Sequence, residues 1–405
     1  MPSPRPVVLV DATLLRTVTG FYGMGRFAYD LLHGLEQTRA EWEGRLRVAT
    51  VTHLRLPARF EIREDLAAAA DEAIAERGSV DYHAALARRR LLLGAAARSA
   101  GAGVVHMTQE AGSPLVLRVP RIATCHDIIP LVYPRRYLGG DPDALLALTW
   151  RAEYAKRLGK DLRRYRRAAR VVAISDRSRR DLIDLLHVDP ARIDVVHNGV
   201  DLSRFADPPA GDDEARRARL GVGRRPYVVY VGACDWRKNL TGLFSAVHRA
   251  RREVDLDLVW AGRLEPYEAV RIEREAREAG IRPNLRRLGF VADADLPALY
   301  RGAVAHAFLS RLEGFGLTVV EAMASGCPVV VGRGSATDEI AGDAGVIVDP
   351  DDAETAGSTL ARLCRDPDER ARRIALGRDR ARHFDRARMA RGYVESYLRA
   401  VAPVR

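Results

Sequence analysis

The sequence predicts an α/β protein built from two doubly wound, Rossmann-like domains, and three observations lead to this prediction. Short β-branched runs alternate with longer amphipathic stretches along the whole chain. The runs are continuously apolar, which is typical of parallel strands covered by helices on both faces. The series is interrupted once, by a Pro-, Gly- and Asp-rich segment at residues 205–214 that has the composition of a linker. The 405 residues are enough for two such domains.

The expected elements follow in order. We expect strands at 7–13, 46–52, 104–107, 121–127, 171–175 and 193–197, and then at 227–232, 257–261, 287–291, 303–309, 328–331 and 345–348. Helical spacing of apolar residues predicts a closing amphipathic helix over 385–401. We therefore assign residues 1–205 with 385–405 to an amino-terminal domain and 206–384 to a carboxy-terminal domain. Ligands bind at the carboxyl ends of parallel strands, so we expect both domains to face a central cleft.

Composition limits the partners. The formal net charge of +11 favours an anionic partner such as a phosphorylated small molecule, a membrane surface or nucleic acid. No apolar run is long enough to span a membrane and the first residues do not resemble a secretory signal, so we expect a cytoplasmic protein. Residues 151–170 carry nine basic and two acidic residues. This expected helix is either a solvated surface or a peripheral contact with the inner face of the membrane.

A glycine loop joins two expected strands of the second domain. Gly314 and Gly316 allow a ligand to approach the backbone closely, and a helix that begins near Leu317 offers free N–H groups to a diphosphate. Glu321 lies one turn into this helix, where its carboxylate can accept hydrogen bonds from ribose hydroxyls, and Glu313 ends the preceding strand. In the alternative interpretation, Glu321 only complements the helix dipole and Glu313 is a surface charge.

Glu313 and Glu321, with seven residues between them, resemble the E-x7-E motif of retaining glycosyltransferases with the GT-B fold, family 4 in particular. The resemblance covers nearly the whole chain. It implies that Glu313 contacts the donor sugar and that Glu321 contacts the nucleotide ribose. The nucleotide-sugar site that it implies also includes Gly25, Gly232, Val291, Gly314, Phe315, Gly316 and Leu317.

A second segment of the same domain agrees with this resemblance. Residues 231–240 are similar to the family's strand-end Gly…Arg-Lys-Asn segment, whose basic pair neutralises the donor diphosphate; the resemblance gives this catalytic role to Arg237 and Lys238. Lys238 is informative because only three of the 65 basic residues are lysines, the others being Lys156 and Lys160. Ala233 replaces a basic residue of some family members, which leaves more of the phosphate charge to the pair.

The amino-terminal half matches as well. The segment containing His126 and Asp127 resembles the family's strand-end His-Asp motif, which implies that His126 acts in catalysis and borders the donor sugar and the acceptor. Gly23, Met24 and Gly25 resemble its glycine-rich loop after the first strand, and with Asp127 they are implied on the acceptor side. Residues 174–201 resemble the segment that closes this domain. Taken alone, the glycine pattern could also be a dinucleotide fingerprint.

The resemblance implies a retaining hexosyltransferase that uses a nucleotide-diphospho sugar, with GDP-mannose preferred and UDP-glucose next. The acceptor would be a glycan, a lipid-linked sugar or a small molecule. The Asp-x-Asp pairs at 255/257 and 293/295 are not beside a glycine loop, so we expect no metal site and no cofactor. Fixed positive charge and helix N–H groups would then stabilise the leaving diphosphate.

Two other functions stay open. Nucleotide-sugar epimerases and some phosphorylases share the two-domain architecture, and a phosphorylase would need a cofactor lysine, for which only Lys238 is near the expected site. A non-enzymatic nucleic-acid binder would use the charge of residues 151–170. Aromatic residues are only 6 % of the chain and no stacking motif accompanies the arginines, so we expect no nucleic acid partner.

Overall fold

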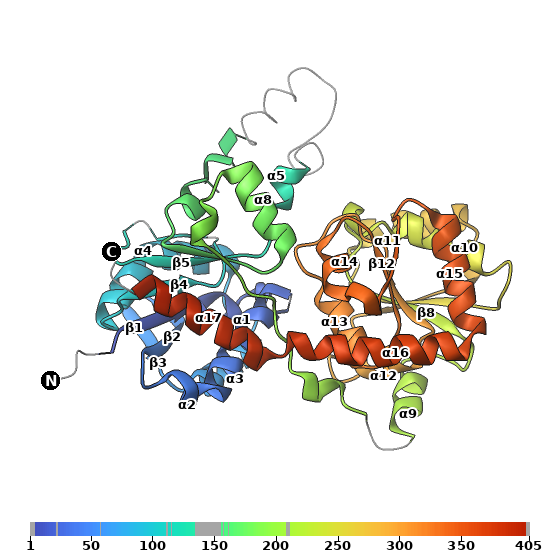
Figure 1. The fold of residues 1–405 in the computed structure, drawn as a ribbon, viewed down its shortest axis with the longest axis horizontal. Helices are drawn as coiled ribbons and strands as arrows, with labels where there is room; N and C mark the ends of the chain where they lie inside the picture. Colours follow the sequence, from blue (N-terminus) through green and yellow to red (C-terminus); the bar gives the residue numbers. More distant parts are fainter. Residues whose placement is uncertain are drawn as a thin grey trace. The chain divides into compact units, whose positions relative to one another are not determined.

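The computed structural model describes residues 5–21, 23–56, 58–110, 112–114, 116–133, 155–156, 158–160, 162–207 and 211–401. The chain divides by its internal contacts into two compact units. Unit 1 contains residues 1–199 and 385–405, and unit 2 contains residues 200–384. Each unit has a central sheet with helices packed over it (Figure 1).

Unit 1 has a seven-stranded sheet in the order β3-β2-β1-β4-β5-β6-β7. Neighbouring strands are parallel except for β3, which runs antiparallel to β2. The strands are β1 (Val7–Asp11), β2 (Arg47–Arg55), β3 (Arg59–Arg63), β4 (Val104–Met107), β5 (Arg121–Cys125), β6 (Arg170–Ala173) and β7 (Ile193–Val195). The helices are α1 (Gly23–Gln37), α2 (Arg39–Trp42), α3 (Leu66–Ala75), α4 (Tyr82–Ser99), α5 (Ile129–Val132), α8 (Asp176–Leu186) and α17 (Arg386–Val401), with 3-10 turns η1 (Thr13–Arg16), η2 (Val18–Phe21) and η3 (Pro190–Arg192).

Unit 2 has a parallel six-stranded sheet in the order β10-β9-β8-β11-β12-β13. The strands are β8 (Tyr227–Val231), β9 (Asp257–Ala261), β10 (Leu285–Gly289), β11 (Ala305–Phe308), β12 (Val329–Gly332) and β13 (Val346–Val348). The helices are α9 (Asp212–Arg219), α10 (Leu240–Ala250), α11 (Pro266–Glu278), α12 (Leu296–Gly302), α13 (Leu317–Ala324), α14 (Ala336–Ala341), α15 (Ala353–Arg365) and α16 (Pro367–Ala381). Its 3-10 turns are η4 (Leu202–Phe205), η5 (Trp236–Lys238), η6 (Arg282–Asn284), η7 (Gly342–Ala344) and η8 (Arg382–Phe384).

In both sheets the strand order reverses direction at one point, which is where ligands bind in doubly wound folds. In unit 1 the strand order changes direction between β1 and β4, and in unit 2 it changes direction between β8 and β11. The loops that follow these strands lie at the carboxyl edge on both sides of the switch, where ligands of such sheets bind. In unit 2 these are the loops that carry Lys238 and Glu313.

The observed elements differ from the expected ones at three places described here. Strand β3 was not expected, because it is a charged edge strand with no fully buried residue. The strand expected at 287–291 begins two residues earlier, at Leu285. In the segment expected to be a linker, the described residues from Asp212 onward begin α9, whose first turn carries three acidic residues that favour the helix dipole.

The unit boundary lies before that segment. Unit 2 begins at Val200, whose backbone N–H donates to the carbonyl oxygen of Phe384 at 2.8 Å. The turn η4 also packs on α13 of unit 2. Residues 200–205 are therefore held by unit 2, although we had placed them in the first domain.

The closing helix α17 packs on unit 1, alongside α1 (Figure 1). Tyr393 and Tyr397 are fully buried in the core that α1 shares with the sheet. The ring of His106 in β4 lies between two hydroxyls, with Nδ1 2.8 Å from Tyr397 Oη and Nε2 2.8 Å from Thr124 Oγ1. Burial lowers the pKa of His106 to about 3, so the ring is a neutral structural link between β4 and α17.

Candidate active site

The loop after β8 folds into η5, which sets the direction of two basic side chains. The carboxylate of Asp235 caps this turn by accepting a hydrogen bond from the N–H of Arg237 at 3.0 Å. Asn239 ends the turn with a left-handed backbone (φ 52°) and starts α10, and its side-chain amide donates to the carbonyl oxygen of Pro350 at 2.5 Å. Because both ends of η5 are fixed, Arg237 and Lys238 leave the backbone from a defined position.

The loop after β11 is tied to this turn by its backbone and by Ser310. The N–H of Arg311 donates to the carbonyl oxygen of Arg237 at 2.8 Å, and Ser310 Oγ lies 2.9 Å from the same oxygen. The two strand-end loops on either side of the switch point in unit 2 therefore form one rigid edge. This edge brings together residues that are more than seventy positions apart in the sequence.

Three charged side chains meet at this edge. Glu313 Oε2 lies 2.6 Å from an Arg237 guanidinium nitrogen, and Glu313 Oε1 lies 2.7 Å from Lys238 Nζ. Ser310 Oγ donates to the same Oε1 at 2.6 Å. The side chain of Glu313 is 8 % exposed and that of Lys238 is 12 % exposed, so the pair is largely removed from water. The three groups together carry a net charge of one positive unit.

The surroundings determine how these groups ionise. Burial raises the pKa of Glu313, but the adjacent charges of Lys238 and Arg237 outweigh burial and hold that pKa below its ordinary value. Burial lowers the pKa of Lys238, and the attraction of Glu313 opposes this shift without cancelling it. Lys238 Nζ also lies 4.7 Å from the centre of the Phe308 ring, a cation–π distance.

The glycine loop leads directly into α13. Gly316 has a φ of 106°, and a Cβ there would lie 2.7 Å from Thr337 Cγ2, so only glycine fits this turn. Leu317 begins the helix, and both residues are half-exposed at its N-terminus. The buried ring of His306 in β11 lies 3.3 Å from Thr318 Oγ1 of the same helix. The N–H groups of the first turn are therefore presented at the same carboxyl edge as Lys238.

Glu321 lies deeper than the sequence suggested. Its residue is 1 % exposed, and its Oε2 accepts a hydrogen bond from the hydroxyl of Tyr300 in α12 at 3.3 Å. A ribose would have to reach this carboxylate from the side of the glycine loop. The contact with Tyr300 gives Glu321 a structural role in joining α13 to α12, and the ribose contact stays a prediction.

The other residues expected in the nucleotide-sugar site take different positions in unit 2. Gly232 follows β8, and its carbonyl oxygen accepts the indole N–H of Trp260 at 2.9 Å. Val291 and Phe315 are buried, at 6 % and 4 % exposure, and Phe315 packs edge-on against Phe384 at 5.8 Å between ring centres. Gly314 is also buried. Of this group in unit 2, Gly232, Gly316 and Leu317 are half-exposed.

In unit 1, His126 follows β5 at the carboxyl edge of the sheet. Its Nε2 donates to the carbonyl oxygen of Thr108 at 2.8 Å, because a carbonyl can only accept, and this leaves Nδ1 as the acceptor nitrogen of a neutral ring. Burial lowers the pKa of His126, which favours the neutral form. The ring of Phe27 stands edge-on to His126 at 4.9 Å. Asp127 is exposed, and its carboxylate caps the N–H of Ile129 at 3.1 Å.

The glycine loop of unit 1 joins η2 to α1. Gly25 is buried at the start of α1, and a Cβ there would lie 2.5 Å from the carbonyl oxygen of Thr19 and from the Cα of Gly20. Gly25 therefore allows α1 to begin in contact with η2. Gly23 and Met24 are exposed beside it, and Met24 is 40 % exposed. His126 packs on α1 through Phe27, so it lies beside the helix that Gly23, Met24 and Gly25 begin. His126, Asp127 and Phe27 are called the His126 group below.

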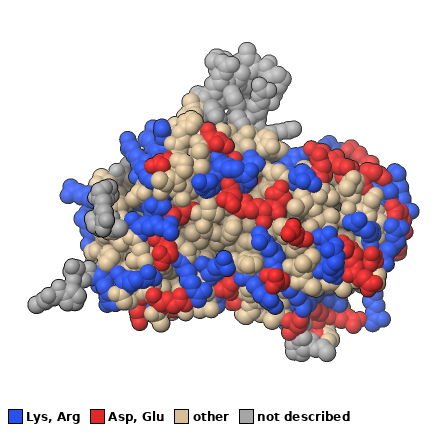
Figure 2. Space-filling view, viewed as in Figure 1, with Lys and Arg blue, Asp and Glu red and all other residues tan. Residues whose placement is uncertain are grey.

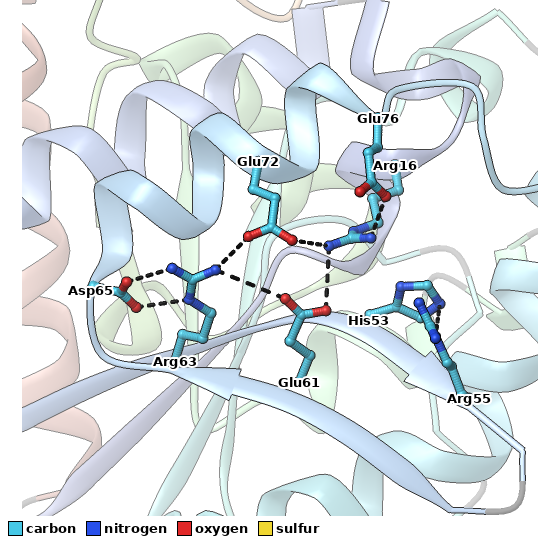
Figure 3. Close-up of polar contacts among 8 residues, drawn as sticks. All are labelled: Arg16, His53, Arg55, Glu61, Arg63, Asp65, Glu72 and Glu76. Carbon is cyan, nitrogen blue, oxygen red and sulfur yellow. Dashed lines mark hydrogen bonds and ion pairs between the residues drawn. The ribbon is translucent and has the colours of Figure 1, made fainter.

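A network of charges holds the start of this loop. Figure 3 shows Arg16, from η1, reaching Glu61 in β3 and Glu72 and Glu76 at α3, with Arg16 nitrogens 3.3 Å from both Glu61 and Glu72. Arg63 bridges the same carboxylates, 2.5 Å from Glu72. The side chain of Arg16 is 3 % exposed. It therefore fixes η1 against β3 and α3, and with it the loop that leads to α1.

Several expected features lie partly or wholly outside the described residues. Of the basic segment 151–170, residues 151–154, 157 and 161 are not described, and the described part is helical at 155–156, 158–160 and 162–166. Within the described parts of the chain, no helix has the length and apolarity to cross a bilayer. The same residues contain no group of three or more His, Cys, Asp or Glu side chains arranged to hold a metal ion.

Sequence reasoning did not identify three residues that shape this site. Ser310 orients Glu313, Phe308 lies against Lys238, and Tyr300 holds Glu321. Each acts through a contact between elements that no local motif records. The position of Ser310 directly after a strand and three residues before Glu313 was the only available signal.

Two family profiles match the chain. The profile described as Glycosyl transferases group 1 matches residues 212–380, and the profile described as Glycosyltransferase Family 4 matches residues 22–204. The first match contains the Lys238 and Glu313 loops, and the second contains the His126 group. Together the matches span most of both units.

Curated relatives and solved structures agree with these profiles. D-inositol 3-phosphate glycosyltransferase from Salinispora arenicola is 34 % identical over 293 residues, which cover 68 % of this chain and 64 % of that relative. MMP alpha-(1->4)-mannosyltransferase from Mycolicibacterium hassiacum is 30 % identical over 313 residues, covering 74 % and 71 %. The fold is similar to that of HepE from Anabaena, solved with UDP-glucose, at a TM-score of 0.69 and 17 % identity, covering 96 % of this chain and 99 % of that one.

Proposed function

Because the chain belongs to glycosyltransferase family 4 and has the GT-B fold, we propose that it transfers a hexose from a nucleotide-diphospho sugar to an acceptor with retention of configuration. The observation that carries this proposal is the trio of Glu313, Arg237 and Lys238, joined at 2.6 and 2.7 Å at the switch point of unit 2. The half-exposed N-terminus of α13 lies on the loop from the same strand as Glu313. Together these groups offer fixed positive charge to a diphosphate.

In the proposed reaction the bond between the anomeric carbon and the β-phosphate oxygen breaks. Negative charge then develops on the diphosphate, which Arg237 and Lys238 stabilise more strongly in the transition state than in the ground state. The acceptor hydroxyl attacks from the same face, and its proton passes to the departing phosphate oxygen. No protein carboxylate is required as a base, and Glu313 instead orients the two cations and contacts the sugar.

The donor is proposed as GDP-mannose first and UDP-glucose next. The names of two relatives support a mannosyl donor: the mannosyltransferase from Mycolicibacterium hassiacum and the O-antigen chain mannosyltransferase B from Escherichia coli, which is 30 % identical over 219 residues. HepE was solved with UDP and with UDP-glucose, and this supports UDP-glucose as the second candidate donor. The proposed acceptor is a glycan, a lipid-linked sugar or a small molecule. We also propose that the protein acts in the cytoplasm and needs neither a metal ion nor a cofactor.

A thermal-shift panel of GDP, UDP, ADP and their sugar conjugates tests the donor. A nucleotide at one hundred times its Kd should stabilise the protein by about 2.7 kcal/mol. Release of the nucleoside diphosphate from the selected donor is then measured with candidate acceptors in excess EDTA, where we expect activity to persist. If no sugar nucleotide raises the melting temperature, the proposal is wrong.

The same assay separates the alternative functions. An epimerase would interconvert the sugar nucleotide without any acceptor, and a phosphorylase would require inorganic phosphate as co-substrate. Loss of turnover in EDTA with rescue by Mg²⁺ or Mn²⁺ would contradict the metal-independent part of the proposal. A non-enzymatic nucleic-acid binder would turn over none of the donors.

A further inference from the structure

Unit 1 contains a second concave site that the proposed chemistry does not use. A cavity of about 710 Å³ lies between α4, the described residues 112–114 and 117–121 that lead into β5, and a segment that contributes Lys160, Arg163, Arg164 and Arg167. This volume is in the range of small-molecule sites. None of its lining residues belongs to the His126 group or to the loop with Gly23 and Gly25.

The cavity is lined by charge of one sign. Six of its fourteen lining residues are basic and none is acidic: Arg90, Arg121, Lys160, Arg163, Arg164 and Arg167. All fourteen lie in the described part of the chain. Four of the basic residues are exposed, so a ligand can reach them from solvent. A cleft lined by one sign of charge with apolar walls concentrates the field and attracts ions of the opposite sign.

Hydrogen bonds from Arg121 hold part of the cavity wall in place. The guanidinium of Arg121, the first residue of β5, donates to the carbonyl oxygen of Arg163 at 3.1 Å and also to that of Arg164. These bonds hold the end of the helical segment against the sheet. Leu86, Leu117 and Val119 supply an apolar part of the lining.

The acidic group behind this wall does not cancel the positive charge. Ser113, which lines the cavity, donates to the backbone oxygen of Glu110 at 3.0 Å and to its carboxyl at 3.3 Å. The second carboxyl oxygen of Glu110 is buried and has no hydrogen-bond partner among the described residues. Burial raises the pKa of Glu110 against the opposing pull of Arg121 and Arg164, which favours its neutral form.

A cavity of similar size in unit 2 shows why arginine content alone is not sufficient. That cavity, about 780 Å³, is also lined by several arginines. There Arg224 is paired with Glu214 at 2.8 Å and Arg301 with Asp213 at 2.6 Å, and Glu214 itself lines the cavity. The charge of the unit 2 cavity is compensated by neighbouring carboxylates. Among the described residues that line the cavity of unit 1, none is acidic.

We propose that the basic cavity of unit 1 is a binding site for a ligand with two or more phosphate groups. Guanidinium groups match the oxygens of phosphate in a planar, two-pronged geometry, and a lysine adds a compact charge. The ligand is either a soluble phosphorylated compound or the headgroup of a phospholipid, since both present the same chemistry. The experiments below measure ligand binding and not turnover. They therefore test this site independently of the proposed transfer reaction.

The scarcity of lysine makes the site directly observable. Lys160 lines the cavity, whereas Lys156 lies one helical turn earlier, is exposed and is not a lining residue. The full-length protein is treated with a limiting amount of an amine-acetylating reagent, with and without inorganic tripolyphosphate, and each lysine is quantified by mass spectrometry. We expect tripolyphosphate to slow acetylation of Lys160 by roughly fivefold or more and that of Lys156 by less than about twofold, because charge screening by a free ion affects both alike.

Two double variants test the role of the cavity arginines. Each removes two positive charges, so the two proteins have the same net charge. In Arg163→Ser/Arg167→Ser the selective protection of Lys160 should be lost. The control Arg274→Ser/Arg277→Ser removes two exposed arginines of α11 in unit 2, whose side chains are each 69 % exposed. Protection should survive in the control. Equal protection of both lysines in the wild-type protein, no protection, or equal loss in both variants would overturn the proposal.

Vesicles distinguish the two sources of the ligand. Vesicles of cardiolipin, a phospholipid whose headgroup carries two phosphates, and tripolyphosphate are compared at equal phosphate concentration, with phosphatidylcholine vesicles as the neutral control. Selective protection of Lys160 by either anionic source supports the cavity and identifies which source binds. Equal protection of Lys156 and Lys160 by anionic vesicles, with none from tripolyphosphate, would indicate a broad membrane contact of residues 151–170 and would contradict the cavity site.

Discussion

Lys238 Nζ lies 2.7 Å from Glu313 Oε1, although the two residues come from loops that follow different strands. Both side chains are largely shielded from water, and their mutual attraction offsets part of the cost of burying each charge. Arg237 contributes a second cation to the same carboxylate at 2.6 Å. The three side chains together therefore place one net positive charge at the switch point of unit 2 before any anion binds.

The first prediction concerns Glu313. Glu313→Ala should lower kcat strongly while affinity for the nucleoside diphosphate is retained, because both cations lose their orienting partner but keep their charge. Steady-state kinetics and calorimetric titration of the diphosphate measure the two effects. Glu354→Ala, which removes an exposed carboxylate paired with Arg249, is the control and should be neutral. A Glu313→Ala kcat within a few-fold of wild type would contradict the assignment.

The second prediction concerns pH. Burial lowers the pKa of Lys238, so its proton is lost at a lower pH than the roughly 10.4 of a free lysine. We expect kcat/KM for the donor to fall on the alkaline side below that value, since kcat/KM reports the ionisation of the free enzyme. In Lys238→Arg, which stays protonated, this alkaline limb should disappear although the overall rate is lower. An unchanged limb in Lys238→Arg would show that another group causes it.

The sequence predicted this edge of unit 2 well because its chemistry is local. The E-x7-E spacing and the Arg-Lys-Asn segment each lie within one loop, and parallel strands bring the carboxyl ends of such loops to one edge. The alternation of apolar runs predicted both sheets for the same reason. The charged edge strand β3 was not predicted, because its half-buried residues do not form an apolar run.

The depth of a side chain was not predictable in the same way. Glu321 lies one turn into a helix, a position that is often exposed, yet α13 packs against α12 and encloses it beside Tyr300. The contact of Phe308 in β11 with Lys238 likewise depends on how the neighbouring strands β8 and β11 align. Such contacts follow from tertiary packing, which no local spacing encodes.

The third prediction tests the ribose contact of Glu321. Glu321→Ala should weaken nucleoside diphosphate binding by roughly tenfold to a hundredfold, since a hydrogen bond to a charged group is worth about 1.5 to 3 kcal/mol. Tyr300→Phe removes one internal hydrogen bond of Glu321 and keeps the carboxylate, so it should weaken binding much less. Calorimetric titration of the diphosphate compares both with wild type. Equal affinity in wild type and Glu321→Ala would leave Glu321 with its structural role alone.

The fourth prediction concerns the stability of unit 1. Arg89 and Asp11 form a fully buried ion pair at the end of β1. Arg89→Met should lower the free energy of unfolding by about 3 to 5 kcal/mol, because it removes the cation that balances the buried Asp11 charge and leaves that carboxylate with hydrogen bonds from Thr13. Arg391→Met breaks an exposed pair with Glu41 at 2.8 Å and should cost at most about 1 kcal/mol. Scanning calorimetry measures both, and equal losses would contradict the burial argument.

The most direct test of the account is the turnover of Lys238→Ala at saturating donor and acceptor. The account assigns to Lys238 a fixed charge on the leaving diphosphate, so kcat should fall by about a hundredfold or more, comparable to removing one oxyanion donor. Lys238→Arg should restore only part of the rate, because the guanidinium is larger and differently shaped. A kcat for Lys238→Ala within a few-fold of wild type would show that the leaving-group charge is carried elsewhere.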